Sequence, residues 1–334
     1  MDILHGCAIQ NRDRILAHIP CPKPYLHPDY VNIMSDAEPG GAPEFFLVTS
    51  AERFAYYQYV RRDIAVICPE LEPATFFDLT TPFDYGGIHT NDSSLLGFFR
   101  DKFVEYCRDT HVVAEFVRLA PWEMRSLPLD ALHWTTRHVA DHVFIDLTSG
   151  PVDKRLSERR ERDLRKAARR APRVVQADGV EFFMSIYQQT MRKRGAHAYY
   201  FFDQSILDSL TASALLDIWL LEVDGEAVSG IAVLPSDRHA YYFLGGTREG
   251  SLRDGVATHL FVEVATQYRQ QGATAFILGG GQGGVLQFKK GFSDMHIPYF
   301  IGQCIHDKTA YEKLVTLTKR QHNRFFPQYR EKVI

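Results

Sequence analysis

The sequence predicts an α/β protein with mixed, α+β-type sheets, organised as two domains, and three observations support this fold class. The chain has 334 residues, of which 45% are hydrophobic and 24% charged, enough for two globular domains of ordinary size. Short apolar runs typical of strands alternate with segments of helical periodicity. The order of strands, then a helix, then further strands occurs twice, which indicates two copies of one unit despite negligible identity between the halves.

In the first half, aromatic and β-branched runs predict strands, and the first two are separated by a short polar turn that favours a hairpin. Phe99, Phe103 and Cys107 recur at helical spacing and predict a helix over 93–108. The strands expected here are 45–49, 54–60, 75–79, 112–119 and 140–147.

The second half repeats this order with different residues. A helix is expected over 255–271, and a cluster of glycines follows at 279–284. The loop dipeptide Gly150-Pro151 predicts the boundary, so we expect domains over 1–150 and 151–334. The strands expected in this half are 216–223, 227–234, 240–246, 274–278 and 298–305.

Composition predicts a reducing compartment and excludes several protein classes. The cysteines are odd in number, widely spaced and without a CxxC pair, which argues against a disulfide framework. No apolar run approaches the roughly 20 residues of a membrane span, and no signal peptide is recognisable, so we expect a cytoplasmic protein. The formal net charge of −3 excludes a uniformly basic nucleic-acid binder. The five cysteines are Cys7, Cys21, Cys68, Cys107 and Cys304.

Charge is concentrated in one segment, 154–173, which holds ten Lys and Arg residues and three acids. This segment carries +7 and leaves the rest of the chain at −10. One interpretation is a solvated helix stabilised by pairs four residues apart, such as Glu158 with Arg162. The other is a phosphate-binding face, because clustered guanidinium groups displace counterions from polyanions.

Chemistry is expected around the glycine cluster and the segment after it. A literal GxGxxG occurs there, but a dinucleotide-binding fold requires a long helix directly after this motif, and the segment that follows is too short for one. We therefore interpret the cluster as a flexible loop beside a site. Lys289 stands between Phe288 and Phe292, where a partly desolvated ammonium group is available to a developing oxyanion. The alternative is that both phenylalanines are core and the lysine is solvated.

Other residue types give no catalytic signature. His138 and His142 lie four apart on an expected strand, where that spacing does not form a ligand pair, so we interpret them as structural and predict no metal site. No GxSxG motif or activated cysteine is present. An enzyme with this sequence is therefore expected to act by positioning and electrostatics.

Five segments, taken together in their order, resemble the Fem-type family of non-ribosomal peptidyltransferases, best known for building peptidoglycan cross-bridges. The resemblance spans roughly residues 25–305 and implies two tandem GNAT-like acyltransferase domains, the first on the acceptor side and the second on the donor side. The segments are 81–87, 162–167, 241–247, 278–281 and 288–292.

The resemblance implies an aminoacyl-tRNA donor, no further cofactor, and an amine acceptor. The acceptor would be a small peptide or peptide-like molecule, such as a peptidoglycan precursor or a nucleoside-peptide metabolite. Lys289 matches the family's Phe-Lys motif and is the expected catalytic residue. The substrate-binding candidates are Phe288, Tyr85, Gly86, Gly87, Arg192 and Arg194, and the tRNA-binding candidates are Arg159, Arg162, Lys166 and Arg169.

Two alternatives remain open. GNAT enzymes that use acyl-CoA hold its pyrophosphate in a (Gln/Arg)-x-x-Gly-x-(Gly/Ala) turn that opens a helix. Segment 252–257 matches this turn at Gly255 and Ala257, but Leu252 replaces the first residue and Asp254 is expected to repel an anion. An acyl-CoA-dependent N-acyltransferase is therefore the second hypothesis, and a non-catalytic RNA-binding module that uses the basic segment is the third.

Overall fold

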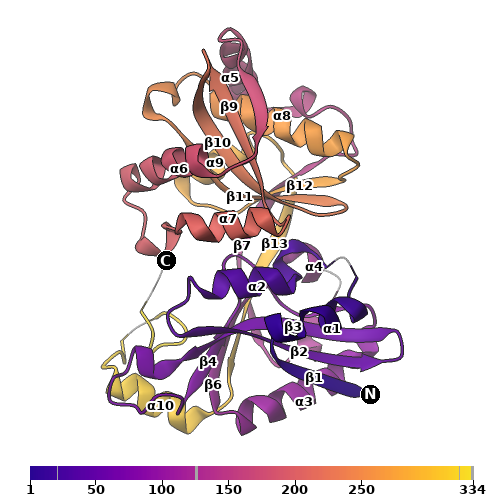
Figure 1. The fold of residues 1–334 in the computed structure, drawn as a ribbon, viewed down its shortest axis with the longest axis vertical. Coiled ribbons are helices and arrows are strands. Elements are labelled where there is room, and N and C mark those ends of the chain that lie inside the picture. Colours follow the sequence, from indigo (N-terminus) through magenta and orange to yellow (C-terminus); the bar gives the residue numbers. More distant parts are fainter. Residues whose placement is uncertain (21, 125–126, 323, 332–334) are drawn as a thin grey trace. The chain divides into compact units, whose positions relative to one another are not determined.

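A computed structural model describes residues 1–20, 22–124, 127–322 and 324–331, and these residues form two compact units (Figure 1). Unit 1 comprises 1–139 and 299–334, and unit 2 comprises 140–298. The helices are α1 Arg12–His18, α2 Pro28–Ser35, α3 Leu96–Asp109, α4 Pro121–Met124, α5 Glu158–Ala168, α6 Glu181–Lys193, α7 Gln204–Ala212, α8 Val256–Gln270, α9 Gly283–Lys290 and α10 Lys308–Leu317. The strands are β1 Asp2–Cys7, β2 Gly41–Ser50, β3 Arg53–Asp63, β4 Phe77–Thr80, β5 His89–Thr90, β6 Val112–Arg118, β7 Thr135–Asp146, β8 Arg173–Ala177, β9 Asp217–Val223, β10 Glu226–Pro235, β11 His239–Thr247, β12 Ala275–Gly279 and β13 His296–Ile305.

The main sheet of unit 1 has the strand order β1-β2-β3-β4-β6-β13. All neighbours are antiparallel except β4 and β6, which are parallel and are connected through α3. Both faces of the sheet are buried. Tyr57 and Tyr59 of β3 pack in the same cluster as α3, whereas Tyr56 and Val60 pack in the cluster that includes residues of α1 and α2. Burial on both faces explains why this strand reads as an unbroken apolar run.

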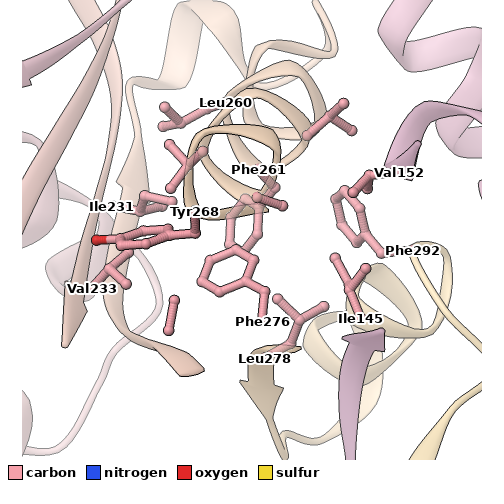
Figure 2. Packing of buried hydrophobic residues seen from close by; sticks show 14 of the residues in the cluster. Ile145, Val152, Ile231, Val233, Leu260, Phe261, Tyr268, Phe276, Leu278 and Phe292 are labelled. Carbon is pink, nitrogen blue, oxygen red and sulfur yellow. The ribbon is translucent and has the colours of Figure 1, made fainter. Parts of the chain in front are cut away.

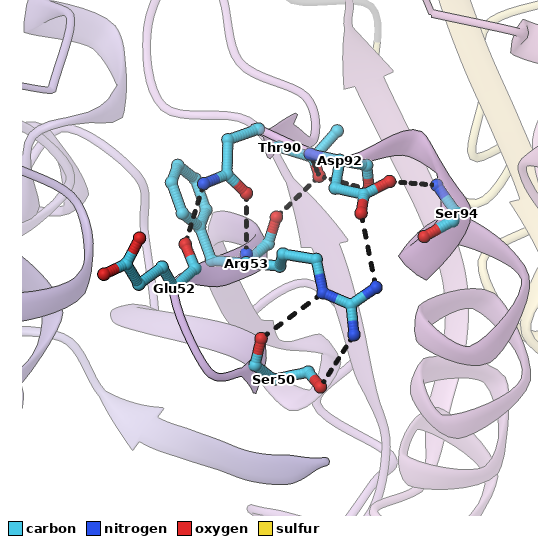
Figure 3. Close-up of polar contacts among 8 residues, drawn as sticks. Ser50, Glu52, Arg53, Thr90, Asp92 and Ser94 are labelled. Atoms are coloured by element: carbon cyan, nitrogen blue, oxygen red, sulfur yellow. Dashed lines mark hydrogen bonds and ion pairs between the residues drawn. The ribbon is translucent and has the colours of Figure 1, made fainter.

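The turn of the β2–β3 hairpin is fixed by polar contacts to the segment before α3 (Figure 3). Asn91 accepts a hydrogen bond from the Phe54 amide at 2.8 Å and donates one to the Glu52 carbonyl at 2.8 Å. Asp92 accepts a hydrogen bond from the Ser94 amide at 2.9 Å and pairs with Arg53. These contacts satisfy backbone groups that a turn would otherwise leave to solvent.

The sheet of unit 2 has the order β8-β9-β10-β11-β12-β7, again with a single parallel pair, β11 and β12, connected through α8. The core lies between this sheet and α8, where Leu260 and Phe261 meet Phe276 and Leu278 of β12 (Figure 2). Helix α6 covers the opposite face. Its Phe183 lies where a β-carbon on Gly230 of β10 would point, whereas the next residue, Ile231, points into the α8 core.

The two sheets share one plan: three antiparallel pairings, one parallel pairing across a helical crossover, and one final antiparallel strand. The predicted tandem α/β organisation is therefore confirmed, with strand and helix positions close to those expected. The basic helix is shorter than the basic segment, because α5 begins after its N-cap Ser157, whose hydroxyl accepts a hydrogen bond from the Arg160 amide.

The predicted division at residue 150 is corrected by the structure. Residues 143–146 of β7 pair with β12 in unit 2, and residues 301–305 of β13 pair with β6 in unit 1. Each sheet thus takes its last strand from the opposite half of the chain. The hydrophobic pattern of a strand specifies which of its faces are buried but not which strand lies beside it, so the sequence does not reveal this exchange.

No helix in the described part of the chain is long and apolar enough to cross a membrane. Cys7, Cys68, Cys107 and Cys304 are free thiols, and Cys21 lies outside the described residues.

Candidate active site

The candidate site in unit 2 arises where the two parallel strands separate. Strands β11 and β12 are paired only from His239 to Tyr241, opposite Ala275 to Ile277. Beyond that point β11 continues to Thr247, paired with β10 alone. Ligands in open α/β sheets bind at the carboxyl ends of parallel strands, where such a gap forms.

A pocket of about 760 Å³ lies at this gap and is lined by six helices and strands of unit 2 and by the segment before α8. Strand β11 contributes residues from Tyr242 onward, α8 contributes its first turn, and α9 contributes much of its length. The amino-terminal half of α5, the carboxyl end of α6, two residues of β10 and the segment 249–255 complete the lining. The volume is that of a site for a substrate or cofactor.

Like Arg160, Lys289 is a buried cation of this pocket. Its side chain lies on α9 and is only 7% exposed, whereas the adjacent Lys290 is exposed. The Nζ atom donates a hydrogen bond to the Gly280 carbonyl in the glycine cluster and lies 5.1 Å from the centroid of the Tyr242 ring. The expectation that Lys289 is desolvated beside the glycine loop is confirmed, and the alternative of a solvated lysine is wrong.

His142 of β7 lies next to this lysine. Burial lowers the pKa of His142 to about 3, with a further contribution from the positive charge of Lys289. A β-carbon on Gly280 would lie 2.7 Å from His142 Nε2, so the glycine is required for this close approach. The neutral imidazole therefore adds no positive charge beside Lys289 at physiological pH.

Arg160 is a buried pocket residue that the sequence analysis did not select. It donates a hydrogen bond to Thr258 Oγ1 at 2.9 Å, pairs with Asp163 at 3.0 Å, and lies 4.7 Å from the centroid of the Phe288 ring. Its side chain fixes α5 against α8 and α9. A signal was present, because Arg160 occupies the apolar stripe of α5, four residues before Leu164.

The pocket is cationic. Six basic and two acidic side chains line it, and both acids are paired: Asp163 with Arg160, and Glu249 with Lys193. Among the described residues, the remaining arginines have no ion pair. A pocket of this charge favours an anionic ligand such as a phosphate ester. These arginines are Arg159, Arg194 and Arg253.

Asp254 does not repel an anion in the way the sequence suggested. Lys166 lies 3.4 Å from its carboxylate and Arg170 lies 3.1 Å from it, so two cations of the α5 region neutralise it. Lys166 also donates a hydrogen bond to the Arg253 carbonyl. The first turn of α8 is therefore compatible with a phosphate group.

Six of the predicted site residues line this single pocket, although they come from distant parts of the sequence. They are Lys289, Phe288, Gly255, Ala257, Arg159 and Arg194.

The other predicted residues lie outside the pocket. Arg192 is exposed and donates a hydrogen bond to Gln188, one turn earlier on α6. Arg162 lies 3.9 Å from Glu158, as the helical spacing predicted. Lys166 is engaged with Asp254, and Arg169 is exposed. Their role in tRNA binding stays a prediction.

Tyr85, Gly86 and Gly87 belong to unit 1 and follow β4. Gly86 exchanges backbone hydrogen bonds with the strand end at Arg118 and with Ala120, each at 2.8 Å. A β-carbon at Gly87 would lie 2.9 Å from the Met124 sulfur, and φ at Gly87 is +120°. Tight packing thus accounts for these two glycines, and their contribution to acceptor binding stays a prediction.

Gly255 is expected to be indispensable for the pocket wall. It has φ +75°, and a β-carbon there would lie 2.1 Å from the Asp163 carbonyl oxygen, so α5 and α8 meet at this residue. We expect Gly255→Ala to destabilise the protein by about 2–4 kcal/mol, from backbone strain and overpacking together. Thermal unfolding measures this. Gly250→Ala is the matched control, because nothing lies within 4 Å of the added carbon, and an equal effect of both variants would contradict the assignment.

Comparison with known proteins agrees with this architecture. Residues 157–290 match the family described as "Acetyltransferase (GNAT) domain", a span that contains the whole pocket lining. No curated protein sequence is similar enough to this chain to count as a match.

Solved structures extend the likeness to both units. The chain is similar to the crystal structure of FemX, with 13% identity, a TM-score of 0.69, and coverage of 94% of this chain and 99% of that one. It is similar to L-PGS from Bacillus licheniformis, with 10% identity, a TM-score of 0.60, and coverage of 92% and 95%. It is also similar to the C-terminal domain of a putative lysylphosphatidylglycerol synthetase from Agrobacterium fabrum, with 13% identity, a TM-score of 0.58, and coverage of 93% and 96%. The expected Fem-like fold with tandem GNAT-type units is confirmed.

Proposed function

We propose that the protein is an aminoacyltransferase that moves an aminoacyl group from a tRNA ester to the amine of a peptide or peptide-like acceptor. The observation that carries the proposal is Lys289, a buried ammonium group in the wall of a cationic pocket. The GNAT domain and the Fem-like fold support an acyltransferase. The fold shared with lysylphosphatidylglycerol synthetases, whose name denotes an aminoacylated lipid, supports the aminoacyl group as the transferred unit.

The chemistry needs no protein nucleophile. The acceptor nitrogen attacks the ester carbon, the C–N bond forms, the C–O bond to the ribose breaks, and the proton lost by the amine goes to the leaving ribose oxygen. The ammonium group of Lys289 stabilises the negative charge on the tetrahedral oxygen. The pocket lining in the described part of the chain contains neither Cys nor His, which fits direct transfer. Phe288 and Tyr242 shape the wall beside Lys289.

The unpaired arginines are suited to the phosphates of the donor. We expect replacement of Arg159, Arg194 and Arg253 together by Gln to raise the donor KM at least 10-fold. The slope of log KM against log salt should also become shallower by about 0.7 for each lost phosphate contact. Donor KM measured at several salt concentrations tests this. Arg137→Gln, an exposed arginine of unit 1, is the control, and an unchanged salt slope in the triple variant would contradict phosphate binding.

Acyl-CoA is the alternative donor, and one observation favours it. The first turn of α8 lines the pocket through Gly255 and Ala257, with Asp254 neutralised by Lys166. A CoA pyrophosphate would fit the same cations. Both donors carry phosphate groups, so the positive charge of the pocket does not distinguish aminoacyl-tRNA from acyl-CoA.

One experiment separates these functions. The protein is incubated with charged tRNA or with acetyl-CoA, together with a library of amines, and the products are identified by mass spectrometry. Transfer from tRNA supports the proposal, and transfer from acetyl-CoA alone would overturn it in favour of an N-acyltransferase. Salt-sensitive RNA binding without transfer to any amine would favour a non-catalytic RNA-binding module.

A further inference from the structure

Unit 1 contains a buried cluster of metal-ligating side chains that plays no part in the proposed transfer reaction. Glu115 of β6 is 0% exposed, and the side chains of His133 and His306 are 4% and 2% exposed. Glu115 Oε2 lies 2.7 Å from His133 Nε2 and 3.2 Å from His306 Nε2. One ligand atom from each of the three residues lies within 4.8 Å of the other two.

The carboxylate in this cluster requires a positive partner. An ionised carboxylate without water or a counter-charge is strongly disfavoured in a protein interior. In the described part of the chain, the recorded ion pairs of Glu115 are with the two histidines and with no Lys or Arg. Glu115 Oε1 and His133 Nδ1 are buried and have no hydrogen-bond partner among the described residues. The carboxylate is therefore stabilised either by hydrogen bonds from the two imidazoles alone or by a cation bound between the three groups.

The donor set fits a transition-metal ion. Two imidazole nitrogens and a carboxylate are the ligands of many three-residue zinc sites, with bond lengths of about 2.0–2.2 Å. Ligand atoms of a tetrahedral zinc consequently lie about 3.3–3.5 Å apart. The Glu115–His306 separation of 3.2 Å is already close to this value, and the Glu115–His133 separation of 2.7 Å needs to open by about 0.6 Å.

The surroundings resemble those of a buried metal centre. Cys304 is the register partner of Glu115 across β6 and β13, and its sulfur lies 3.8 Å from His306 Nδ1. The two imidazole ligands favour Zn²⁺ over Mg²⁺ or Ca²⁺, which prefer oxygen ligands. The rings of Trp134 and Phe103 pack against His133 at centroid distances of 4.9 and 5.2 Å and exclude water from this side.

We propose that Glu115, His133 and His306 bind a Zn²⁺ ion in unit 1, with a water molecule as the fourth ligand of the tetrahedral site. The three ligands come from β6, from the segment before β7, and from the residue that follows β13. An ion held by them would join the carboxyl-terminal segment to the first half of the chain at the exchanged strand. The site therefore stabilises unit 1 and takes no part in the transfer chemistry.

Metal binding by the full chain tests the site. The protein is stripped with EDTA and dialysed, then titrated with Zn²⁺ by calorimetry, and its thermal midpoint is measured with and without the metal. We expect one Zn²⁺ per chain with a micromolar or tighter Kd, and a higher midpoint in its presence. Co²⁺ should give the intense visible absorption of a tetrahedral site, and this absorption should disappear when Zn²⁺ is added.

Variants distinguish this site from adventitious binding. The double variant His133→Gln with His306→Gln keeps neutral groups able to donate a hydrogen bond to Glu115 but removes both imidazoles. We expect it to bind Zn²⁺ at least 100-fold more weakly. His322→Gln, an exposed histidine, is the matched control and should bind as the wild type does. Equal affinity in the double variant would overturn the proposal.

The wild-type titration remains decisive even where the double variant does not fold. Absence of stoichiometric Zn²⁺ binding, of the Co²⁺ absorption and of a thermal shift in the wild type would overturn the proposal and leave the cluster as a hydrogen-bonded carboxylate and two histidines without a metal. None of these readouts depends on transferase activity.

Discussion

Replacing Lys289 with Met is expected to lower kcat for aminoacyl transfer by about 100- to 1000-fold, the usual cost of removing one oxyanion donor. Lys289 is 7% exposed in the pocket wall, where a low local dielectric strengthens its effect on a developing negative charge. Methionine has a similar length and no charge, so the core around α9 should be kept. Single-turnover rates with charged tRNA, together with the thermal midpoint, measure the two effects separately.

Lys290→Met is the matched control, because this neighbouring lysine is exposed and does not line the pocket. It should retain wild-type kcat. If Lys289→Met folds and keeps full kcat, the proposed electrophilic role is wrong, whichever donor the enzyme uses.

Replacing Asp78 with Asn is expected to destabilise unit 1 by about 3–5 kcal/mol. Asp78 of β4 is 0% exposed and accepts hydrogen bonds from Arg62 at 2.8 Å and from Arg330 at 2.5 Å. Neutralising the carboxylate leaves both guanidinium groups buried beside an amide, although Arg62 retains Glu38 at 2.9 Å. Because Arg330 belongs to the carboxyl-terminal segment, this cluster also fixes that segment to unit 1.

Denaturant unfolding of Asp78→Asn and of the control Asp101→Asn tests this prediction. Asp101 pairs with Arg100 at the surface, where its side chain is 68% exposed, so its loss should change stability by less than about 1 kcal/mol. Burial raises the pKa of Asp78, but the two arginines outweigh that effect and hold it below its ordinary value. The contribution is therefore complete above the ordinary carboxyl pKa and is lost as pH falls below it. Equal stability of both variants would contradict the assignment.

Much of the candidate site followed from local sequence. Lys289 was identified because a lysine between two phenylalanines and beside a glycine loop is a local pattern that predicts desolvation. Arg160 was overlooked although it lies four residues before Leu164 on the apolar stripe of α5, because that stripe is short and surrounded by other basic residues. Its burial depends on packing against α8 and α9, which brings Thr258 and Phe288 to the same guanidinium group.

Asp254 shows that the electrostatic effect of a charged residue also depends on residues that are distant in the sequence. Its neighbours in sequence suggested repulsion of a phosphate, whereas Lys166 and Arg170, more than 80 residues away, neutralise it. His138 and His142 were interpreted as structural from their spacing on a strand, whereas no expectation was attached to His133 or His306. The convergence of His133 and His306 on Glu115 spans 191 residues and has no local signal.

The sequence by itself determined the mixed α/β class, the tandem order of elements, most strand positions, the helices α3, α5 and α8, and the segment that contains the candidate catalytic lysine. These features depend on periodicity, turns and caps, which act over a few residues. Only the tertiary structure decided that β7, from the first half of the chain, is the last strand of the sheet in unit 2, and that β13, from the second half, is the last strand of the sheet in unit 1. It also decided which cations line the pocket and which buried acids find partners. Such choices depend on contacts between residues far apart in the chain, so the net charge and hydrophobic pattern of a segment do not specify them.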